Sequence, residues 1–527
     1  MAIPQPKIET PFSEIEKSFQ EIQKKVFKKR PVLEEVIFRN GQKTLFEYAE
    51  DYLDVNLNPP ILKRQVDFIT TFKSEVKRLL GSNVAEAAAK QLAKYYFVST
   101  ADHHGPICHP FFINTNIMTM MPYFTHKDTN LDFVIVLSCA NISLNNSSFP
   151  RGLVFNSFQN GNSKMHRLSF LPSNAHSSTV YNFRAYTSEE IQKVKNVLRE
   201  KVLNKELNIR EKDLITEVLD STYNTPDALQ CENFSDQITK TNFSLWRNFF
   251  PYNKVKKPDL IYIEQESLVM KLICDHHLDE DTTISRVLFN KKYDDIIIKY
   301  FDGMHGAFSV SEKIGTYLFW GVSDAKNYRV QLWKNGNYLM SDDESTKIEL
   351  TPESIRVAIE KKQIIPSMML IFMVLSFYYG LKCLGGFSQI NYLTHMKNAY
   401  IKMQADLEAY RSIEVCARAQ TKELGGDLVI AYLGEKKENG IVVPATGLDL
   451  ILYGNENTWE YLMEMTKELT LYEAISPMMP EFYKIIYPEK ERDDTLCKVS
   501  GPDIAEFLEL NKKIKLCAHF PTVENVN

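Results

Sequence analysis

The longest uncharged apolar stretch of the chain limits the folds that are open to it. Residues 364–381 read IIPSMMLIFMVLSFYYGL and contain no charged side chain. A membrane-spanning helix needs about 20 apolar residues, and Pro366 is expected in the first helical turn, which shortens the usable stretch. A helix that is apolar on every side belongs in a membrane or in a protein core, and this length favours a core. We therefore expect a fully buried apolar helix near 366–381 and no membrane partner.

Composition favours a globular protein with more than one domain. The chain has 527 residues, of which 44% are hydrophobic and 24% are charged. A chain of this length exceeds one ordinary hydrophobic core. We expect a mixed α/β protein, of the α/β or α+β class, divided into five segments. These are a helical N-terminal region (1–94), an α/β region with a histidine-rich loop (95–220), a linker or lid (221–259), a second α/β region with the buried helix (260–430) and a C-terminal α+β region (431–527).

Local patterns assign several elements within these segments. Apolar residues recur three and four positions apart over 12–28 and 61–80, which is typical of amphipathic helices. The short apolar run FVIVLS at 133–138 predicts a buried strand, and we interpret LVMKLIC at 268–274 in the same way. The dipeptides Asn335-Gly336 and Thr446-Gly447 predict hairpin turns.

Charge and cysteine usage exclude some classes of protein. The formal net charge is −5, and the basic runs are short and far apart, so no nucleic-acid partner is expected. The 8 cysteines include no CxxC pair, which argues against a zinc ribbon or a disulfide framework. Reduced thiols and an N-terminus without an apolar signal segment predict a cytoplasmic protein.

The segment DHHGPICHP at 102–110 is the strongest candidate for chemistry. It brings together His103, His104 and His109 with a carboxylate and a thiol, in a chain with only 11 histidines. A β run ends just before it, and loops that follow strands are where α/β folds place their sites. Imidazole and carboxylate ligands suit zinc, iron or manganese. We predict that the three histidines bind a divalent transition metal, with Asp102 as a further ligand or as the group that orients one of them.

Other residues near this segment are candidates for catalysis or substrate binding. Cys108 is a candidate nucleophile beside a histidine. Asn114 and Asn116 would share one face of an extended segment and could hold a polar substrate group. Arg151, between Pro150 and Gly152, is a candidate anion anchor.

A second histidine pair follows the run LVMKLIC. The spacing of His276, His277 and Asp281 resembles the HHxxxD core of condensation-type acyltransferases. That resemblance implies that His277 takes a proton from an attacking hydroxyl or amine and that Asp281 holds the loop. Thr282 stands where that family has glycine, and no DFGWG-like segment follows. If both histidine pairs follow parallel strands of one sheet, their loops could form one site.

Glycine-rich segments give no sign of a nucleotide cofactor. The segment GMHG at 303–306 could let its backbone approach a substrate, with His305 as a contact. Neither this segment nor Gly385-Gly386 matches a phosphate-binding loop or a dinucleotide fingerprint.

These observations predict a metal-dependent enzyme, most simply a hydrolase acting on a small polar substrate through the histidine-rich loop. The first alternative is acyl transfer of the condensation type through His277. The second is a non-catalytic binding or scaffold protein in which both histidine clusters are structural. The oligomeric state is left open by the sequence.

Overall fold

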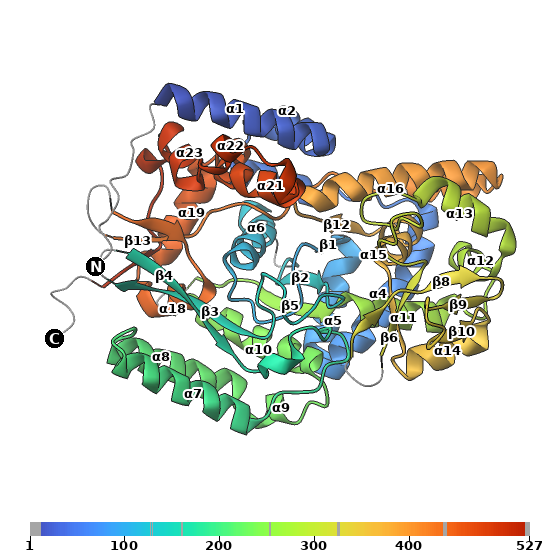
Figure 1. Cartoon of the computed structure of the whole chain (residues 1–527), viewed down its shortest axis with the longest axis horizontal. Coiled ribbons are helices and arrows are strands. Elements are labelled where there is room, and N and C mark those ends of the chain that lie inside the picture. The colour runs from blue at the N-terminus through green and yellow to red at the C-terminus, as the bar shows by residue number, and fades with distance from the viewer. Residues whose placement is uncertain are drawn as a thin grey trace.

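A parallel sheet of four strands lies at the centre of the computed structural model (Figure 1). The structure describes residues 12–126, 128, 130–159, 162–251, 255–323, 327–435 and 440–521. The strand order is β12-β1-β2-β5, and all neighbours are parallel. The bounds are Lys382–Leu384 (β12), Phe97–Ser99 (β1), Phe133–Ser138 (β2) and Asp259–Glu264 (β5). The mixed α/β class predicted from the sequence is confirmed.

Both faces of this sheet are buried. Alternate residues of a strand point to opposite faces, and in β2 Val136 lies in one hydrophobic core while Ile135 and Leu137 lie in another. Helices close both cores: α6 (Pro110–His126) and α10 (Phe234–Asn248) contribute to the first, and α4 (Pro59–Leu80), α5 (Ser82–Lys94) and α11 (Gln265–His276) to the second. A sheet covered on both faces requires strands that are apolar throughout, which is why FVIVLS does not alternate.

The N-terminal region is helical, as expected. Besides α4 and α5 it contains α1 (Phe12–Lys29), α2 (Pro31–Asn40) and α3 (Leu45–Tyr48). Helix α1 packs against α21 (Met479–Ile486) and α23 (Gly501–Phe507), so the two ends of the described chain lie side by side (Figure 1). The first segment therefore shares its core with the last.

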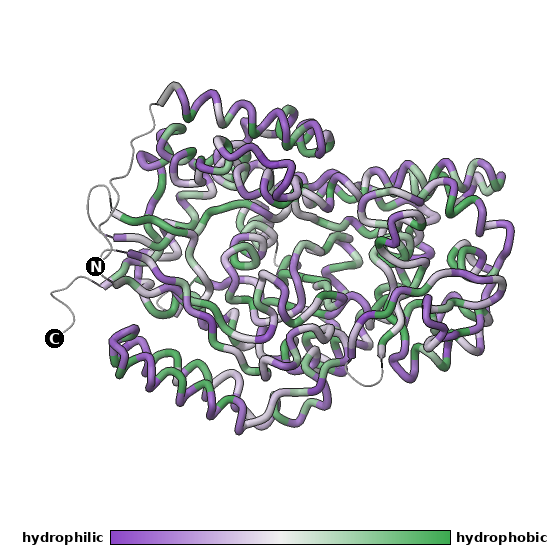
Figure 2. Tube along the Cα trace, in the orientation of Figure 1, coloured by the Kyte–Doolittle hydropathy of each residue, from purple (hydrophilic) through white to green (hydrophobic). Residues whose placement is uncertain are grey.

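The apolar segment 364–381 is buried almost throughout, but the single helix expected there is not what the structure contains. It begins as a strand, β11 (Ile364–Pro366), and continues as α15 (Met368–Phe372) and a π-helical turn, Met373–Tyr378. The helix starts late because β11 pairs with β6 (Phe319–Val322) and because Ser367 caps the first turn by accepting from the Leu370 N–H. Figure 2 shows the segment as a largely hydrophobic stretch inside the molecule. Among the described residues, no helix is long and apolar enough to cross a membrane.

The run LVMKLIC was predicted to be a strand, and this prediction is wrong. The strand of this region is β5, which ends at Glu264, and the run lies in α11. The Glu264 side chain caps α11 by accepting from the Ser267 N–H. Because α11 is covered by protein on several sides, its sequence lacks the polar stripe that would have marked a helix.

The stretch expected as a linker or lid, 221–259, contains helices. It holds α9 (Pro226–Leu229) and α10, and α10 packs directly against β5. The polar residues that suggested a linker include helix caps such as Thr225 and Asn233.

Smaller sheets surround the central one. Their strands are β3 (Gly152–Gln159) with β4 (Asn162–Ser169); β7 (Arg329–Val330), which joins β6 and β11; β8 (Trp333–Asn335), β9 (Tyr338–Met340) and β10 (Lys347–Glu349); and β13 (Tyr432–Gly434), β14 (Val442–Pro444) and β15 (Ala518–His519). The hairpin at Asn335-Gly336 is confirmed, with φ of 59° at Gly336. The hairpin expected at Thr446-Gly447 is absent, because Thr446 instead caps α18 (Gly447–Tyr453).

The remaining helices form the outer parts of the molecule (Figure 1). They are α7 (Ser188–Leu203), α8 (Ile209–Val218), α12 (Thr283–Phe289), α13 (Asp294–Phe301), α14 (Pro352–Glu360), α16 (Phe387–Asp406), α17 (Tyr410–Ala417), α19 (Thr458–Glu468), α20 (Leu471–Ile475) and α22 (Asp494–Cys497).

Candidate active site

The carboxyl ends of the four parallel strands meet at one edge of the central sheet. The histidine-rich loop follows β1, Cys139 follows β2, Gln265 follows β5 and Gly385 follows β12. The chain leaves β1 towards α6 and β2, whereas β12 lies on the other side of β1. Ligands of open parallel sheets bind outside the carboxyl ends of the strands, where neighbouring connections diverge. This edge is therefore the first place to look for a site.

His104 lies at this edge and is fully buried. Its Nδ1 is 2.7 Å from the Ser138 hydroxyl, and its Nε2 is 3.1 Å from the Ser235 carbonyl oxygen. Burial lowers the pKa of His104 to about 4, so the ring is neutral at pH 7. Both ring nitrogens are engaged, and the ring connects β1 and β2 to the first turn of α10.

The other two histidines of the loop have different partners. The His103 Nδ1 lies 3.1 Å from the Asn146 Oδ1, and the His109 Nδ1 accepts from the Phe111 N–H at 3.4 Å. Within the described residues, no group of three or more His, Cys, Asp or Glu side chains is placed to hold a metal ion. The three predicted ligands do not fit one metal in this arrangement, and we derive no step through a metal.

Asp102 is buried beneath the same loop. Its Oδ2 accepts from the Asn116 amide at 3.1 Å, while its Oδ1 has no hydrogen-bond partner among the described residues. Burial raises the pKa of Asp102 to about 8, and the nearby Asp427 adds to the rise. The carboxyl is therefore largely protonated at neutral pH.

Three further candidates near the loop are fully buried. Asn114 and Asn116 lie in α6 rather than in an extended segment, and the Asn114 Oδ1 accepts from the N–H groups of Ile430 and Ala431 at 2.8 Å each. Cys108 is fully buried, and burial raises the pKa of its thiol far above the usual range. A thiol that stays protonated is a poor nucleophile.

The second histidine pair does not share this edge. His277 follows helix α11, and its ring nitrogens contact the Thr282 hydroxyl at 2.9 Å and the Tyr379 hydroxyl at 3.1 Å. Burial lowers the pKa of His277 to about 3. Asp281 is exposed and pairs with Arg286 at 2.5 Å. His305 is also exposed, and its Nε2 lies 3.4 Å from Arg30 Nη2.

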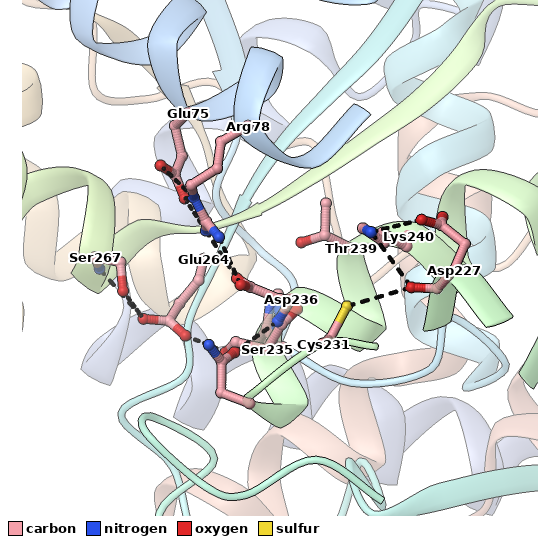
Figure 3. A network of polar contacts seen from close by, with 12 residues as sticks. Glu75, Arg78, Asp227, Cys231, Ser235, Asp236, Thr239, Lys240, Glu264 and Ser267 are labelled. Atoms are coloured by element: carbon pink, nitrogen blue, oxygen red, sulfur yellow. Dashed lines mark hydrogen bonds and ion pairs between the residues drawn. The ribbon is translucent and has the colours of Figure 1, made fainter. Parts of the chain in front are cut away.

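A pocket of about 300 Å³ opens beside the carboxyl end of β5. Glu264, the last residue of β5, lines it together with Ser235 of α10 and Ser267 of α11 (Figure 3). Both serine hydroxyls donate to the Glu264 carboxylate, Ser267 at 2.6 Å and Ser235 through a very short contact. The pocket therefore lies where β5, α10 and α11 converge.

The Glu264 carboxyl group has a pKa well above its ordinary range. Burial raises its pKa to about 7, and repulsion from the neighbouring Glu266 contributes to the rise. Glu266 faces the other way and accepts from the Ala140 N–H at 2.8 Å and the Asn141 N–H at 3.0 Å. A carboxyl group with a pKa near the working pH is suited to both accepting and donating protons.

Charged residues surround the pocket. Arg78 of α4 bridges Glu75 and Asp236, with an Nη1–Oδ2 distance of 2.6 Å to Asp236 (Figure 3). Lys362 also lines the pocket, and its positive charge favours the ionised form of Glu264. No ion pair between Lys362 and another described residue is present. Arg78 balances only one of the two acidic groups that it bridges, and Lys362, whose charge also acts on Asp236 and Glu264, is the second positive group at the pocket.

Ser235, Glu264 and Lys362 were not among the residues predicted from the sequence. One signal could have identified Glu264, because it directly follows the apolar run LIYI of β5. Nothing in the sequence joins it to Ser235, which lies 29 positions earlier. Comparison of the chain with models of known protein families and with curated proteins finds no match.

Proposed function

We propose that this chain is an enzyme that hydrolyses or transfers an acyl group of a small polar substrate in the Glu264 pocket. Ser235 acts as the nucleophile and Glu264 as its general base. The observation that carries this proposal is the hydrogen bond from the Ser235 hydroxyl to a buried carboxyl whose pKa is about 7, at the wall of a pocket. A nucleophile that donates directly to a base is the arrangement that covalent catalysis requires.

The proposed reaction has two balanced steps. In the first, Ser235 Oγ bonds to the acyl carbon, its proton passes to Glu264, and Glu264 then protonates the leaving group. In the second, water or another hydroxyl or amine gives its proton to Glu264 and attacks the acyl-serine. The bond from the acyl carbon to Ser235 Oγ then breaks, and Glu264 returns the proton to Ser235 Oγ. Ser267 holds the second oxygen of Glu264 and so fixes the orientation of the base.

The histidine-rich loop has a positioning role in this proposal. The His104 Nε2 contacts the Ser235 carbonyl oxygen at 3.1 Å, and its Nδ1 contacts Ser138 of β2. Since both contacts join buried groups, the ring holds the first turn of α10 against the sheet. The placement of the nucleophile therefore depends on the loop that the sequence singled out.

The pocket favours a substrate of modest size with a strongly polar group. Its volume of about 300 Å³ lies at the lower end of the range for small-molecule sites. Lys362 offers the ammonium that such a group would contact. We propose that the enzyme works in the cytoplasm, because all 8 cysteines are free thiols, as a reducing compartment favours.

Labelling with an alkyl fluorophosphonate tests the nucleophile without knowledge of the substrate. We expect the parent protein to gain one covalent adduct, which peptide mass spectrometry places on Ser235. Ser235→Ala removes the attacking oxygen and should abolish labelling, and Glu264→Gln should slow it about 100-fold, within the range for loss of a general base.

Ser267→Ala is the matched control for this experiment. Ser267 lines the same pocket and donates to the same carboxyl, but the proposal gives it no bond to the substrate. Labelling within about 10-fold of the parent rate is expected, since Glu264 keeps its hydrogen bond from Ser235 in this variant and the loss of one hydrogen bond costs about 1 kcal/mol. Equal labelling of Ser235→Ala and the parent, with both folded by circular dichroism, would contradict the proposal.

Metal-dependent hydrolysis through His103, His104 and His109, with bound zinc, iron or manganese, stays a prediction from the sequence. Elemental analysis of the tag-free protein and of the triple alanine variant tests it. About one equivalent of metal in the parent, lost in a folded variant, would support it. The acyltransferase alternative through His277 and the non-catalytic alternative also stay predictions, and the absence of any covalent adduct would favour the latter.

A further inference from the structure

A cluster of positive charge lies apart from the Glu264 pocket, where the histidine-rich loop meets the β3–β4 hairpin. Arg151 immediately precedes β3, and Arg167 lies in β4 opposite Val154. The Arg151 carbonyl accepts from the Phe170 N–H at 2.9 Å, which brings Arg151 to the end of the ladder that contains Arg167. The two guanidinium groups share an aromatic neighbour, with their central carbons 5.3 and 5.7 Å from the centre of the Phe149 ring.

Close backbone contact joins this hairpin to the histidine-rich loop. A Cβ atom on Gly105 would lie 2.6 Å from the Pro150 Cα, so only glycine allows the two segments to approach so closely. The Ser148 hydroxyl lies 3.2 Å from the His103 Nδ1. His103 and His109 in turn flank the Phe112 ring, at centre-to-centre distances of 6.1 and 5.4 Å. The backbone segments that carry the arginines and the imidazoles are therefore held together, and the charge of Arg167 acts on His109.

In the part of the chain that the structure describes, the two guanidinium groups have no carboxylate partners, unlike other arginines. Arg184, Arg247 and Arg356 each form an ion pair with an acidic residue. Within the described residues, neither Arg151 nor Arg167 forms one, and the Arg151 Nε is buried with no hydrogen-bond partner. A buried donor without a partner is costly, and two neighbouring cations repel each other. Burial and the charge of Arg167 both lower the pKa of Arg151.

Additional groups make the cluster suitable for an anion. The His109 Nδ1 accepts from the Phe111 N–H, which places the ring proton on Nε2 and makes that nitrogen a donor. His109 immediately precedes α6, whose N-terminal end carries partial positive charge. The same charges would oppose a metal cation at His109.

We propose that Arg151, Arg167 and His109 form a binding site for a phosphate group. A phosphate presents several oxygens to donors that approach from different sides, and two guanidinium groups match it better than they match a neutral ligand. The site is independent of the Glu264 pocket, and either proposal can hold without the other. These donors suit a free phosphate and the phosphate group of a small molecule alike, and inorganic phosphate serves as the probe for the shared chemistry.

Isothermal titration with inorganic phosphate at constant ionic strength tests this site. We expect binding by the parent protein, and a loss of affinity of at least about 10-fold in Arg151→Met and in Arg167→Met, as for loss of a charged hydrogen bond. Arg167 is exposed, so its variant is expected to fold. Phenyl phosphate binding more tightly than phosphate would assign the site to a phosphorylated small molecule.

Lys164→Met is the matched control. Lys164 lies in the same strand, β4, but it is paired with Glu206 at 2.9 Å. We expect this variant to bind phosphate as the parent does, although it loses the same formal charge. Absence of phosphate binding by the parent, equal weakening by all three variants, or equal binding of acetate would overturn the proposal.

Discussion

The two pairs of adjacent histidines in this chain have similar surroundings but different positions in the fold. His104 and His277 are both buried, both use their two ring nitrogens in hydrogen bonds, and both have lowered pKa values. His104 follows a parallel strand and contacts Ser235 beside a pocket, whereas His277 follows a helix and contacts Thr282 and Tyr379. Local composition alone therefore does not separate a positioning histidine from a histidine of the core. The two histidines are distinguished by the element that precedes them, a parallel strand for His104 and a helix for His277.

Replacing each histidine should separate their roles most clearly. We expect His104→Ala to slow fluorophosphonate labelling of Ser235 by about 10- to 100-fold. The variant removes the buried hydrogen bond between His104 Nε2 and the Ser235 carbonyl oxygen, and the loss of such a bond costs about 1–3 kcal/mol. His277→Ala should leave the labelling rate unchanged, although both variants should lower the free energy of unfolding by about 3 kcal/mol. Labelling rates and urea unfolding of the two variants check this contrast. Equal slowing by both would remove the distinction.

The aspartates beside the two histidine pairs, Asp102 and Asp281, provide a second, smaller contrast. The folded-state pKa of Asp102 is raised to about 8, so between pH 6.5 and 8.5 the folded protein holds a proton that the unfolded chain has already lost. Stability should therefore fall by about 2 kcal/mol over this range because of Asp102. Urea unfolding at both pH values should show a loss about 2 kcal/mol larger in the parent than in Asp102→Asn, in which the other titrating carboxyl groups remain. An identical pH dependence in the variant would show that Asp102 is already ionised in the folded protein.

The smallest effect is expected at Asp281 in the second loop. Its carboxylate is exposed and pairs with Arg286 of the following helix, α12, and such surface pairs contribute up to about 1 kcal/mol. Asp281→Ala should change the free energy of unfolding by about 0.5 kcal/mol or less and leave labelling unaffected. A large loss of acyl transfer in this variant would instead support the resemblance to condensation-type acyltransferases.

Much of the fold could be predicted because local signals were unambiguous. The run FVIVLS forms a buried strand, and Asn335-Gly336 forms a hairpin, because each pattern has one favourable structure. The run LVMKLIC could not be assigned correctly, since a short apolar run fits a buried helix as well as a buried strand. Thr446-Gly447 was misassigned for a related reason, because a threonine before a glycine also suits a helix cap.

The candidate site was predictable only in part. The sequence located the loop after β1, and the structure places that loop at the carboxyl edge of the sheet. It could not place Ser235 beside Glu264, because that contact depends on how α10 packs against β5. Arg151 was recognised as a candidate anion anchor, but its neighbour Arg167 was not, since only the register of the β3–β4 hairpin brings them together.

The pH dependence of Ser235 labelling tests the central claim most directly. If Glu264 is the base, the labelling rate of the parent should rise with pH and level off with a midpoint near 7, the pKa of this carboxyl group. Glu264→Gln should label slowly and without that midpoint, while Ser267→Ala should retain a midpoint in the same region. The same midpoint and the same rate in the parent and in Glu264→Gln would contradict the claim.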